Sequence, residues 1–172
     1  ENYSRELLQL FTIGTYKLNM DGTRMLVNGA AVPTYGQDEI EGFAHVFTGW
    51  TYPTLPGGTL IRHNPTNYRG PMEAFPGNHD TAPKILLGGA VLPARDDAVA
   101  DLNDALDNIF LHQNIAPFMS QRLIQHLVTS NPSPAYVARV AAVFVNNGSG
   151  VKGDLSAVVR AILTDPEARD AT

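Results

Sequence analysis

The hydrophobic pattern at the start of the chain is that of amphipathic helices. Apolar residues recur at helical spacing over residues 2–13, and Gly14 follows as a stop signal, so we expect a helix there. The same spacing returns over residues 38–48 and ends before Gly49, which predicts a second helix. The apolar residues expected to face the core from these helices are Tyr3, Leu7, Leu8, Leu10, Phe11, Ile40, Phe43, Ala44 and Phe47.

Between these helices the pattern changes to short runs of β-prone residues. The runs cover residues 16–20, 24–27 and 30–35, and they are separated by Asp-Gly and Asn-Gly pairs, which are turn signals of β-hairpins. We therefore expect a small β-hairpin or meander over residues 15–35, with Pro33 placing the last strand at an edge.

The last part of the chain, residues 96–172, is expected to be a four-helix segment. Helical spacing predicts helices over about 97–111, 116–129, 134–146 and 155–164. The last two begin after residues that favour the N-cap position, Ser133 and Asp154. The side chains expected to face inward from the first, third and fourth helices are Val99, Leu102, Leu106, Ile109, Phe110, Val137, Val140, Ala141, Phe144, Leu155, Val158, Val159, Ile162 and Leu163.

Residues 51–95 separate the two groups of predicted helices. They contain seven prolines and six glycines, so we expect a long ordered loop with a few short strands. A connection of this length is usually functional or a linker. The whole pattern predicts a mainly α fold of five or six helices in a single domain over residues 1–172. Residues 1–95 hold the helix, meander, helix and loop, and residues 96–172 the four-helix segment.

Composition narrows the class of protein. The chain is 44% hydrophobic and 17% charged, with a net charge of -5, which indicates a globular domain and argues against a nucleic-acid binder or a basic membrane-surface module. No apolar run approaches the length of about 20 residues that a transmembrane helix needs. The absence of cysteine excludes disulfides, thiol nucleophiles and Cys-ligated zinc, and leaves the cellular compartment open.

Several separated blocks resemble the signature of a bacterial family, domain-of-unknown-function family 1800. Residues 1–14 are similar to its Glu-Asn-Tyr-x-Arg-Glu-Leu-x-Glu-Leu-Phe-x-x-Gly signature, with Gln9 where members usually have Glu. That departure weakens a role for a second carboxylate on this helix. The other matching blocks, in chain order, are Pro33-Thr34-Tyr35, Phe47-Thr48-Gly49-Trp50, His79-Asp80 with Lys84 and Leu87-Gly88, Pro117-Phe118 with Arg122-Leu123, Asn131-Pro132-Ser133-Pro134, and Gly153-Asp154-Leu155.

The resemblance covers essentially the whole chain and implies an exported bacterial protein of several hundred residues, periplasmic or extracellular. Its export signal would lie upstream of Glu1, so the chain would be the C-terminal part of such a protein. Its expected partners are then the missing N-terminal part or a co-exported protein. No established activity comes with the family.

Polar residues form a stripe on the first predicted helix, at Asn2, Arg5, Glu6 and Gln9. As part of a site, Arg5 would donate two hydrogen bonds to an anion and Glu6 would act as an acid or base. Such a stripe is also typical of a solvated face or of an ion-pair network that docks the helix.

The second candidate group is His79, Asp80 and Lys84, inside the long loop. These residue types serve as acid and base, as metal ligands or as structural clamps. His45 and His63 have no spacing typical of metal ligands, so we expect no tightly bound metal and no cofactor.

Two further residues are candidates for binding. Arg122 lies among apolar neighbours, so it is either half-buried beside a carboxylate or extends its charged end to the surface. Trp50, with the aromatic residues Tyr52, Tyr68 and Phe75, fits either a stacking platform for sugars or a hydrophobic plug under the loop.

These residues leave two hypotheses about function. The first is a non-catalytic structural or interaction module of an exported protein, because nucleophile and metal signatures are missing. The alternative is an enzyme acting on an extracellular polymer or an anionic small molecule. Its candidate catalytic residues are Glu6, His79 and Asp80, and its candidate binding residues are Asn2, Arg5, Lys84, Arg122 and Trp50.

We also expect the charges of the first helix and of the loop to form one cluster. The loop is the only segment long enough to cover the polar face of that helix, and buried charges need opposite partners. The expected pairs are Arg5 with Asp80 and Lys84 with Glu6.

Overall fold

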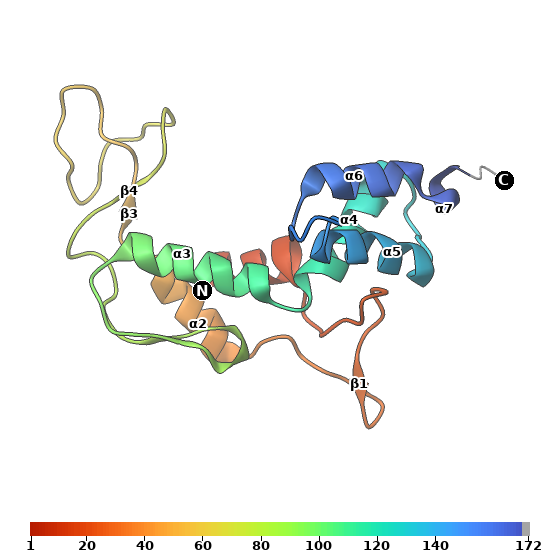
Figure 1. Ribbon diagram of the computed structural model, residues 1–172. Helices are drawn as coiled ribbons and strands as arrows, with labels where there is room; N and C mark the ends of the chain where they lie inside the picture. The colour runs from red at the N-terminus through yellow and green to blue at the C-terminus, as the bar shows by residue number, and fades with distance from the viewer. Residues whose placement is uncertain (170–172) are drawn as a thin grey trace. The chain divides into compact units, whose positions relative to one another are not determined.

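The computed structural model describes residues 1–169 (Figure 1). These residues contain seven α-helices, a π-helix, a short 3-10 helix and three two-stranded antiparallel sheets, so the prediction of a mainly α fold with small hairpins is confirmed. They divide into two compact units, each made from two segments of chain. The first unit contains Glu1–Leu7 and Tyr35–Phe110, and the second contains Leu8–Thr34 and the residues described from Leu111 onward. The expectation of a single domain stays a prediction.

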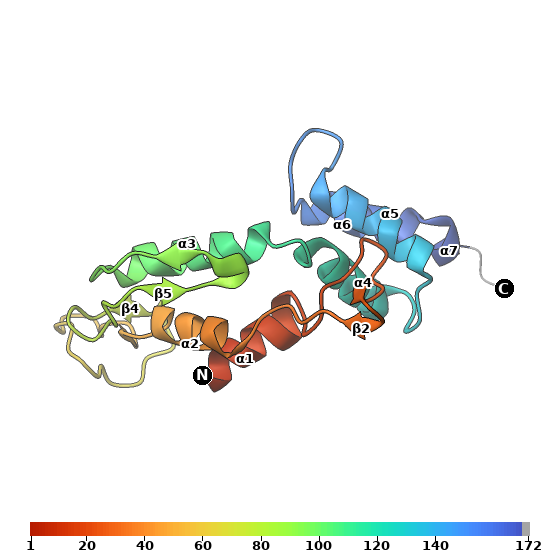
Figure 2. The same ribbon diagram turned by 90° about the horizontal axis from the view of Figure 1, so that it is seen from below.

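The first unit combines three helices with short strands. Its elements are α1 (Asn2–Glu6), α2 (Gln37–Val46), β3 (Trp50–Thr51), β4 (Glu73–Ala74), β5 (Lys84–Ile85), the 3-10 helix η2 (Leu87–Gly89), β6 (Val91–Leu92) and α3 (Ala98–Leu111). β3 pairs with β4 and β5 with β6, both antiparallel. Helix α2 packs against α1 and against β5, which runs beside it in Figure 2. The apolar core of this unit consists of Ile40, Phe43, Val46, Leu86, Leu87, Leu92, Ala98, Ala105 and Ile109.

The contact between α2 and β5 depends on a glycine. A Cβ added at Gly42 would lie 1.8 Å from the carbonyl oxygen of Ile85. Only a residue without a side chain therefore lets the helix approach the strand this closely.

The second unit is a helical bundle that carries the β-meander. Its elements are most of the π-helix η1 (Leu7–Thr12), β1 (Leu26–Val27), β2 (Ala30–Ala31), α4 (Ile115–Leu127), α5 (Pro134–Val145), α6 (Leu155–Thr164) and the one-turn α7 (Pro166–Arg169). The core lies between α4, α5 and α6, where Tyr136 is fully buried and donates a hydrogen bond to the carbonyl of Ile162 at 2.7 Å. Ser133 and Asp154 cap α5 and α6, as the sequence predicts.

The expected meander is present within residues 15–35. β1 and β2 form its hairpin, and single β-bridges join Tyr16 to Pro33 and Leu18 to Arg24. The buried side chain of Asn114 holds it in place: Oδ1 accepts from the backbone N–H of Leu18 at 2.9 Å, and Nδ2 donates to the carbonyl of Tyr16 at 2.7 Å. One neutral amide thus satisfies backbone groups that would otherwise be buried without partners.

The structure adds two details to the predicted helices. Residues 7–12 form a π-helix, and a one-turn helix begins at Pro166. Several residues expected in the core are also exposed, among them Tyr3, Leu10, Phe11, Val99, Leu106, Phe110, Leu155 and Leu163. Helix α3 instead buries Ala98, Asp101, Ala105 and Ile109, because Asp101 has cationic partners inside the unit. Within the described part of the chain, no helix has both the length and the apolar character needed to cross a membrane.

The substitution Gly42→Ala tests the close approach of α2 and β5. Alanine favours helix more than glycine by roughly 1 kcal/mol, but here its Cβ must displace the backbone of Ile85. We expect a net loss of about 3 kcal/mol in the free energy of unfolding, measured by urea denaturation. Glu41→Ala, on the exposed face of the same helix, is the control and should change stability by less than about 0.5 kcal/mol. A variant Gly42→Ala as stable as the parent protein would show that the strand moves freely.

Candidate functional site

A buried ion cluster lies in the first unit around Asp101. Oδ2 of this carboxylate is 2.9 Å from Nε2 of His79 and 2.7 Å from Nζ of Lys84. Oδ1 is 2.5 Å from Nε of Arg95, whose guanidinium also reaches Asp104. The side chains of Lys84 and Asp101 are fully buried, and that of His79 is 2% exposed. We call Asp101, His79, Lys84 and Arg95 the Asp101 cluster.

Every polar group of the Asp101 cluster has a partner. The ammonium of Lys84 donates to Asp101 and to the backbone carbonyls of Asp80 at 2.6 Å and Ala82 at 3.0 Å, which uses its three hydrogens. Nδ1 of His79 lies 3.1 Å from the carbonyl of Thr48. Nδ1 also lies 3.3 Å from the hydroxyl of Thr48, so both ring nitrogens of His79 have hydrogen-bond partners.

Two opposing effects set the protonation of Asp101. Burial would raise the pKa of its carboxyl group, but the hydrogen bonds from Lys84, His79 and Arg95 outweigh burial and hold the pKa below its usual value of 3.8. Asp101 is therefore a carboxylate that neutralises its neighbours. The cluster can clamp the loop at residues 79–84 to α3, and its buried groups are closed to a substrate.

Asp80 belongs to a different and more open environment. Its Oδ2 lies 2.7 Å from Nδ1 of His45, and the two side chains are 30% and 51% exposed. The pKa of Asp80 is lowered, mainly by the hydrogen bond from the backbone N–H of Ala82, with burial opposing and His45 adding to the effect. His45 also lines a hollow of about 340 Å³ beside β5. Asp80 is therefore partly open to solvent, unlike the candidate catalytic residue His79.

The ion pairs expected from the sequence are wrong. Lys84 pairs with Asp101 rather than Glu6, and Asp80 pairs with His45 rather than Arg5. The loop does reach a buried charge, but that charge comes from α3 and not from α1.

Asn2, Arg5 and Glu6 of the polar stripe lie elsewhere in the first unit, and Gln9 belongs to the second unit. The pKa of the Tyr35 phenol is raised above its usual value, mainly by burial. The nearby charge of Arg5 lowers this pKa, and that of Glu6 raises it. Asn2 is exposed. This stripe supplies no partner to the Asp101 cluster.

Sequence reasoning missed Asp101 and Arg95. Asp101 lies in the first turn of α3, where an acidic residue is ordinarily explained by the helix dipole. The feature of the sequence that could have revealed Asp101 is its position, because it shares one helical face with the small residues Ala98 and Ala105.

The first unit also contains an apolar groove of about 670 Å³. Its walls come from α1, α2, α3, the start of β3 and the loop before β4, and its lining residues are Glu1, Tyr3, Ser4, Leu7, Ala44, Phe47, Trp50, Pro71, Met72, Leu102 and Leu106. The rings of Tyr3 and Phe47 meet edge to face at 5.1 Å. We call this surface the Trp50 groove. It places the candidate binding residue Trp50 in an apolar surface rather than beside hydrogen-bonding groups that would suit a sugar.

Arg122, the candidate binding residue of the second unit, is exposed on α4. Its guanidinium lies 5.2 Å from the ring centre of Phe118, and Nη1 donates to Oε1 of Gln125 at 3.0 Å. The half-buried pair with a carboxylate is therefore wrong, and the charged end of Arg122 lies at the surface.

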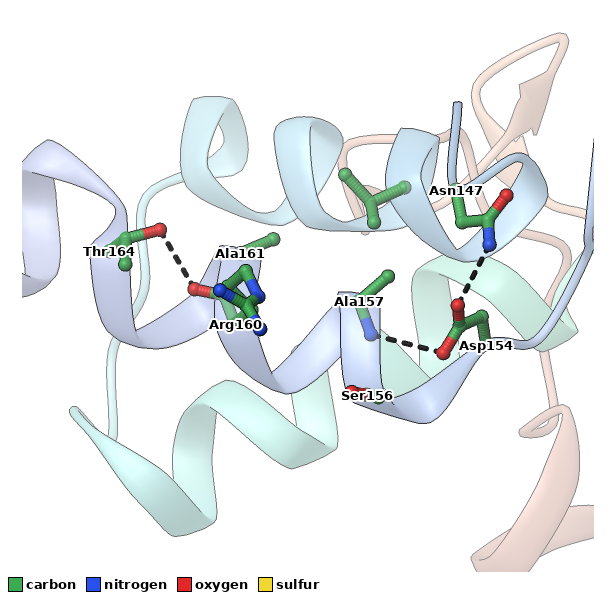
Figure 3. Close-up of a pocket in the computed structure, with 8 residues that line it drawn as sticks. Asn147, Asp154, Ser156, Ala157, Arg160, Ala161 and Thr164 are labelled. Carbon is green, nitrogen blue, oxygen red and sulfur yellow. Dashed lines mark hydrogen bonds between the residues drawn. The ribbon is translucent and has the colours of Figure 1, made fainter. Parts of the chain in front are cut away.

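A hollow between α5 and α6 contains polar groups that serve local structure (Figure 3). The carboxylate of Asp154 caps α6 by accepting from the N–H of Ala157 at 3.1 Å, and it accepts from Nδ2 of Asn147 at 2.7 Å. The hydroxyl of Thr164 donates to the carbonyl of Arg160. Among residues 1–169, no group of three or more His, Cys, Asp or Glu residues could hold a metal ion.

The pair of variants Asp101→Asn and Asp80→Asn separates a buried clamp from a surface pair. Each change keeps the side-chain shape and removes a carboxylate. Asp101→Asn leaves the buried Lys84 without a counter-charge and should cost about 3–5 kcal/mol of unfolding free energy. Asp80→Asn breaks an exposed pair and should cost no more than about 1 kcal/mol. Urea denaturation measures both, and equal losses would contradict the clamp.

The lowered pKa of Asp101 also predicts a dependence on pH. Because the folded pKa lies below the unfolded value near 3.8, the stabilisation by this carboxylate is fully present above pH 3.8 and is lost as the pH falls through the folded pKa. The stability difference between the parent protein and Asp101→Asn should therefore narrow as the pH falls below 3.8, measured by urea denaturation at each pH. A difference that widened in acid would mean that Asp101 is protonated in the folded protein.

Comparison with known proteins gives one match, which agrees with the separated sequence blocks. A family model described as a protein of unknown function, DUF1800, matches residues 1–172. No curated protein and no solved structure gives a significant match. The block formed by His79, Asp80 and Lys84 contributes two side chains to the Asp101 cluster, and the block that ends at Trp50 contributes to the Trp50 groove. With the family model covering its whole length, the chain belongs to the DUF1800 family.

Proposed function

We propose that the protein is a non-catalytic structural and interaction module that binds another protein through the Trp50 groove. The observation that carries this proposal is the closure of the Asp101 cluster. Residues of the type that catalysis needs are buried and paired with one another, with side chains of His79, Lys84 and Asp101 at most 2% exposed. Such an arrangement supports a rigid scaffold rather than turnover of a substrate.

Helix α3 supports the choice of the Trp50 groove as the binding surface. It turns Asp101 inward, and this orientation leaves an apolar stripe at Val99, Leu102, Leu106 and Phe110 on its outer side. Leu102 and Leu106 line the groove. Extended apolar surface of this kind, next to a groove, marks binding sites in soluble proteins.

The chemistry of the Trp50 groove favours an apolar segment of a protein as its occupant. Glu1 is the one charged residue among those that line it, and the hydroxyl of Ser4 is already bonded to the carbonyl of Ile40 at 2.9 Å. A sugar would find few hydrogen-bonding groups. An anionic membrane surface would find no lysine or arginine in the lining, although such surfaces bind mainly to basic residues. An amphipathic helix that inserts apolar side chains needs neither hydrogen-bonding groups nor basic residues in the groove, and it therefore fits this lining.

We place this module outside the cytoplasm, in the periplasm or the extracellular space. The support is the resemblance to exported family members. A co-exported protein, or another part of the same polypeptide, is then the expected source of the apolar segment.

An enzyme acting on an extracellular polymer or an anionic small molecule is the second candidate. It has the support of one observation, the exposed pair of Asp80 and His45 at 2.7 Å beside a hollow. This pair could transfer a proton if a substrate entered there. The carboxylate oxygens of Asp80 are already engaged by the backbone N–H of Ala82 and by the ring of His45, so we favour the interaction module.

Site-specific photocrosslinking tests the Trp50 groove. We expect p-benzoylphenylalanine at Tyr3, which lines the groove and is 67% exposed, to crosslink to an apolar segment of a protein in cells that express the chain. The control places the same group at Tyr68, an exposed aromatic residue outside the groove lining. Mass spectrometry identifies the adducts. Equal adducts at both positions, or adducts with lipid only, would contradict the proposal.

Binding of the crosslinked protein in purified form gives the second measurement. Leu106→Asp introduces a charge into the Trp50 groove and should weaken binding at least about tenfold by calorimetry. Leu55→Asp is the matched control, because Leu55 is 46% exposed and Leu106 is 47% exposed, yet Leu55 does not line the groove. Unchanged binding by Leu106→Asp would exclude the groove as the contact surface.

A further inference from the structure

The second unit has a pocket of about 340 Å³ whose charged lining residues are Arg24 and Arg122. We propose that this pocket binds an oxyanion, a carboxylate or a phosphate, carried by a small molecule with an aromatic or aliphatic part. Its volume lies in the lower part of the range found for small-molecule sites. We call it the two-arginine pocket. It is separate from the Trp50 groove and shares no residue with it.

Both arginines keep donors available for a ligand. The guanidinium of Arg24 lies over the ring of Tyr16, 4.6 Å from its centre. The guanidinium of Arg122 lies over the ring of Phe118 in the same way. Within residues 1–169, neither has a carboxylate oxygen within 4.0 Å, whereas Arg95 and Arg139 are both paired with acids. Stacking on a ring holds the guanidinium plane and leaves its N–H edge free, which is the geometry that recognises carboxylate and phosphate.

The rest of the lining fits an anion that has an apolar part. Gln9 and Gln121 supply amide groups that could donate further hydrogen bonds. Tyr16, Phe118 and Leu10 supply ring and aliphatic surface. No acidic residue is among the lining residues, although the chain has 17 aspartates and glutamates against 12 lysines and arginines. The pocket is thus positive in an acidic protein, and a negative ligand is complementary to it.

An unusual backbone borders the two-arginine pocket and points to it independently. Gln9 and Leu10 come from the π-helix η1, after which the N–H groups of Ile13 and Gly14 both donate to the carbonyl of Leu8, at 3.1 and 2.9 Å. Gly14 has a φ of +74°, and a Cβ there would lie 3.0 Å from the ring of Phe118. π-helical segments are rare and occur often at functional sites.

A titration with small anions followed by NMR tests the proposal on the whole chain. The probes are benzoate and phenyl phosphate, with benzamide as the neutral analogue. We expect saturable shifts of the Gly14 and Gly22 amides with at least one anion, at a dissociation constant of roughly 1 mM, and none with benzamide. Binding of benzoate alone assigns a carboxylate, and binding of phenyl phosphate alone assigns a phosphate. Raising the salt concentration should weaken binding of either anion.

Charge-removing variants assign the binding to the pocket. Arg24→Gln and Arg122→Gln should each raise the dissociation constant at least about tenfold. Arg62→Gln changes the net charge equally at an exposed position of the first unit and should leave the constant unchanged. The proposal is overturned by equal binding of benzamide, by no saturable shift up to about 20 mM anion, or by a dissociation constant that neither pocket variant changes. Amide signals distant from the pocket report that each variant remains folded.

Discussion

The burial of one ionised carboxylate, Asp101, determines much of the first unit. A buried charge must be paired, and Lys84, His79 and Arg95 are the partners that hold it. Helix α3 must therefore turn the face with Asp101 inward, and its larger apolar residues other than Ile109 then lie outward. The Trp50 groove, with Leu102 and Leu106 in its wall, is thus a consequence of where this charge is placed. The ion cluster and the proposed binding surface are two faces of one helix.

The Asp101 cluster also explains how a loop rich in proline and glycine stays ordered. Over residues 51–83 of this segment no Leu, Ile, Phe, Met or Tyr side chain is buried, so hydrophobic burial contributes little to the order of that part. Instead Lys84 bonds two carbonyls of the loop, and His79 joins it to Thr48 at the end of α2 and to α3. Buried ion pairs of this kind are weak evidence for added stability, because desolvation offsets their attraction. Their role here is to allow one arrangement of the loop, since any other would leave a buried charge unpaired.

The sequence predicts what depends on local signals. The helices, the meander within 15–35 and the caps Ser133 and Asp154 follow from spacing and turn residues, which act within a few positions. The inward face of α3 and the partner of Lys84 depend on contacts between residues distant in sequence. The spacing of apolar residues along one helix carries no information about such contacts. The π-helix was also missed, because its extra residue per turn has no distinct pattern in six residues. Of the candidate site residues, His79 and Lys84 lie together around Asp101, a partner that the sequence pattern does not indicate.

Both units bury a carboxylate and pair it with cationic side chains, and this pairing leaves some arginines of residues 1–169 without an acidic partner. In the first unit, Asp101 requires cations, and Lys84 and Arg95 are used inside it. In the second unit, the buried Asp165 is paired with Arg139, and the neutral amide of Asn114 joins the start of α4 to Ile13 and to the meander through three hydrogen bonds. Within residues 1–169, Arg24 and Arg122 have no carboxylate oxygen within 4.0 Å. Their position beside one pocket, stacked on aromatic rings, leaves an external anion as the partner that their charge can serve.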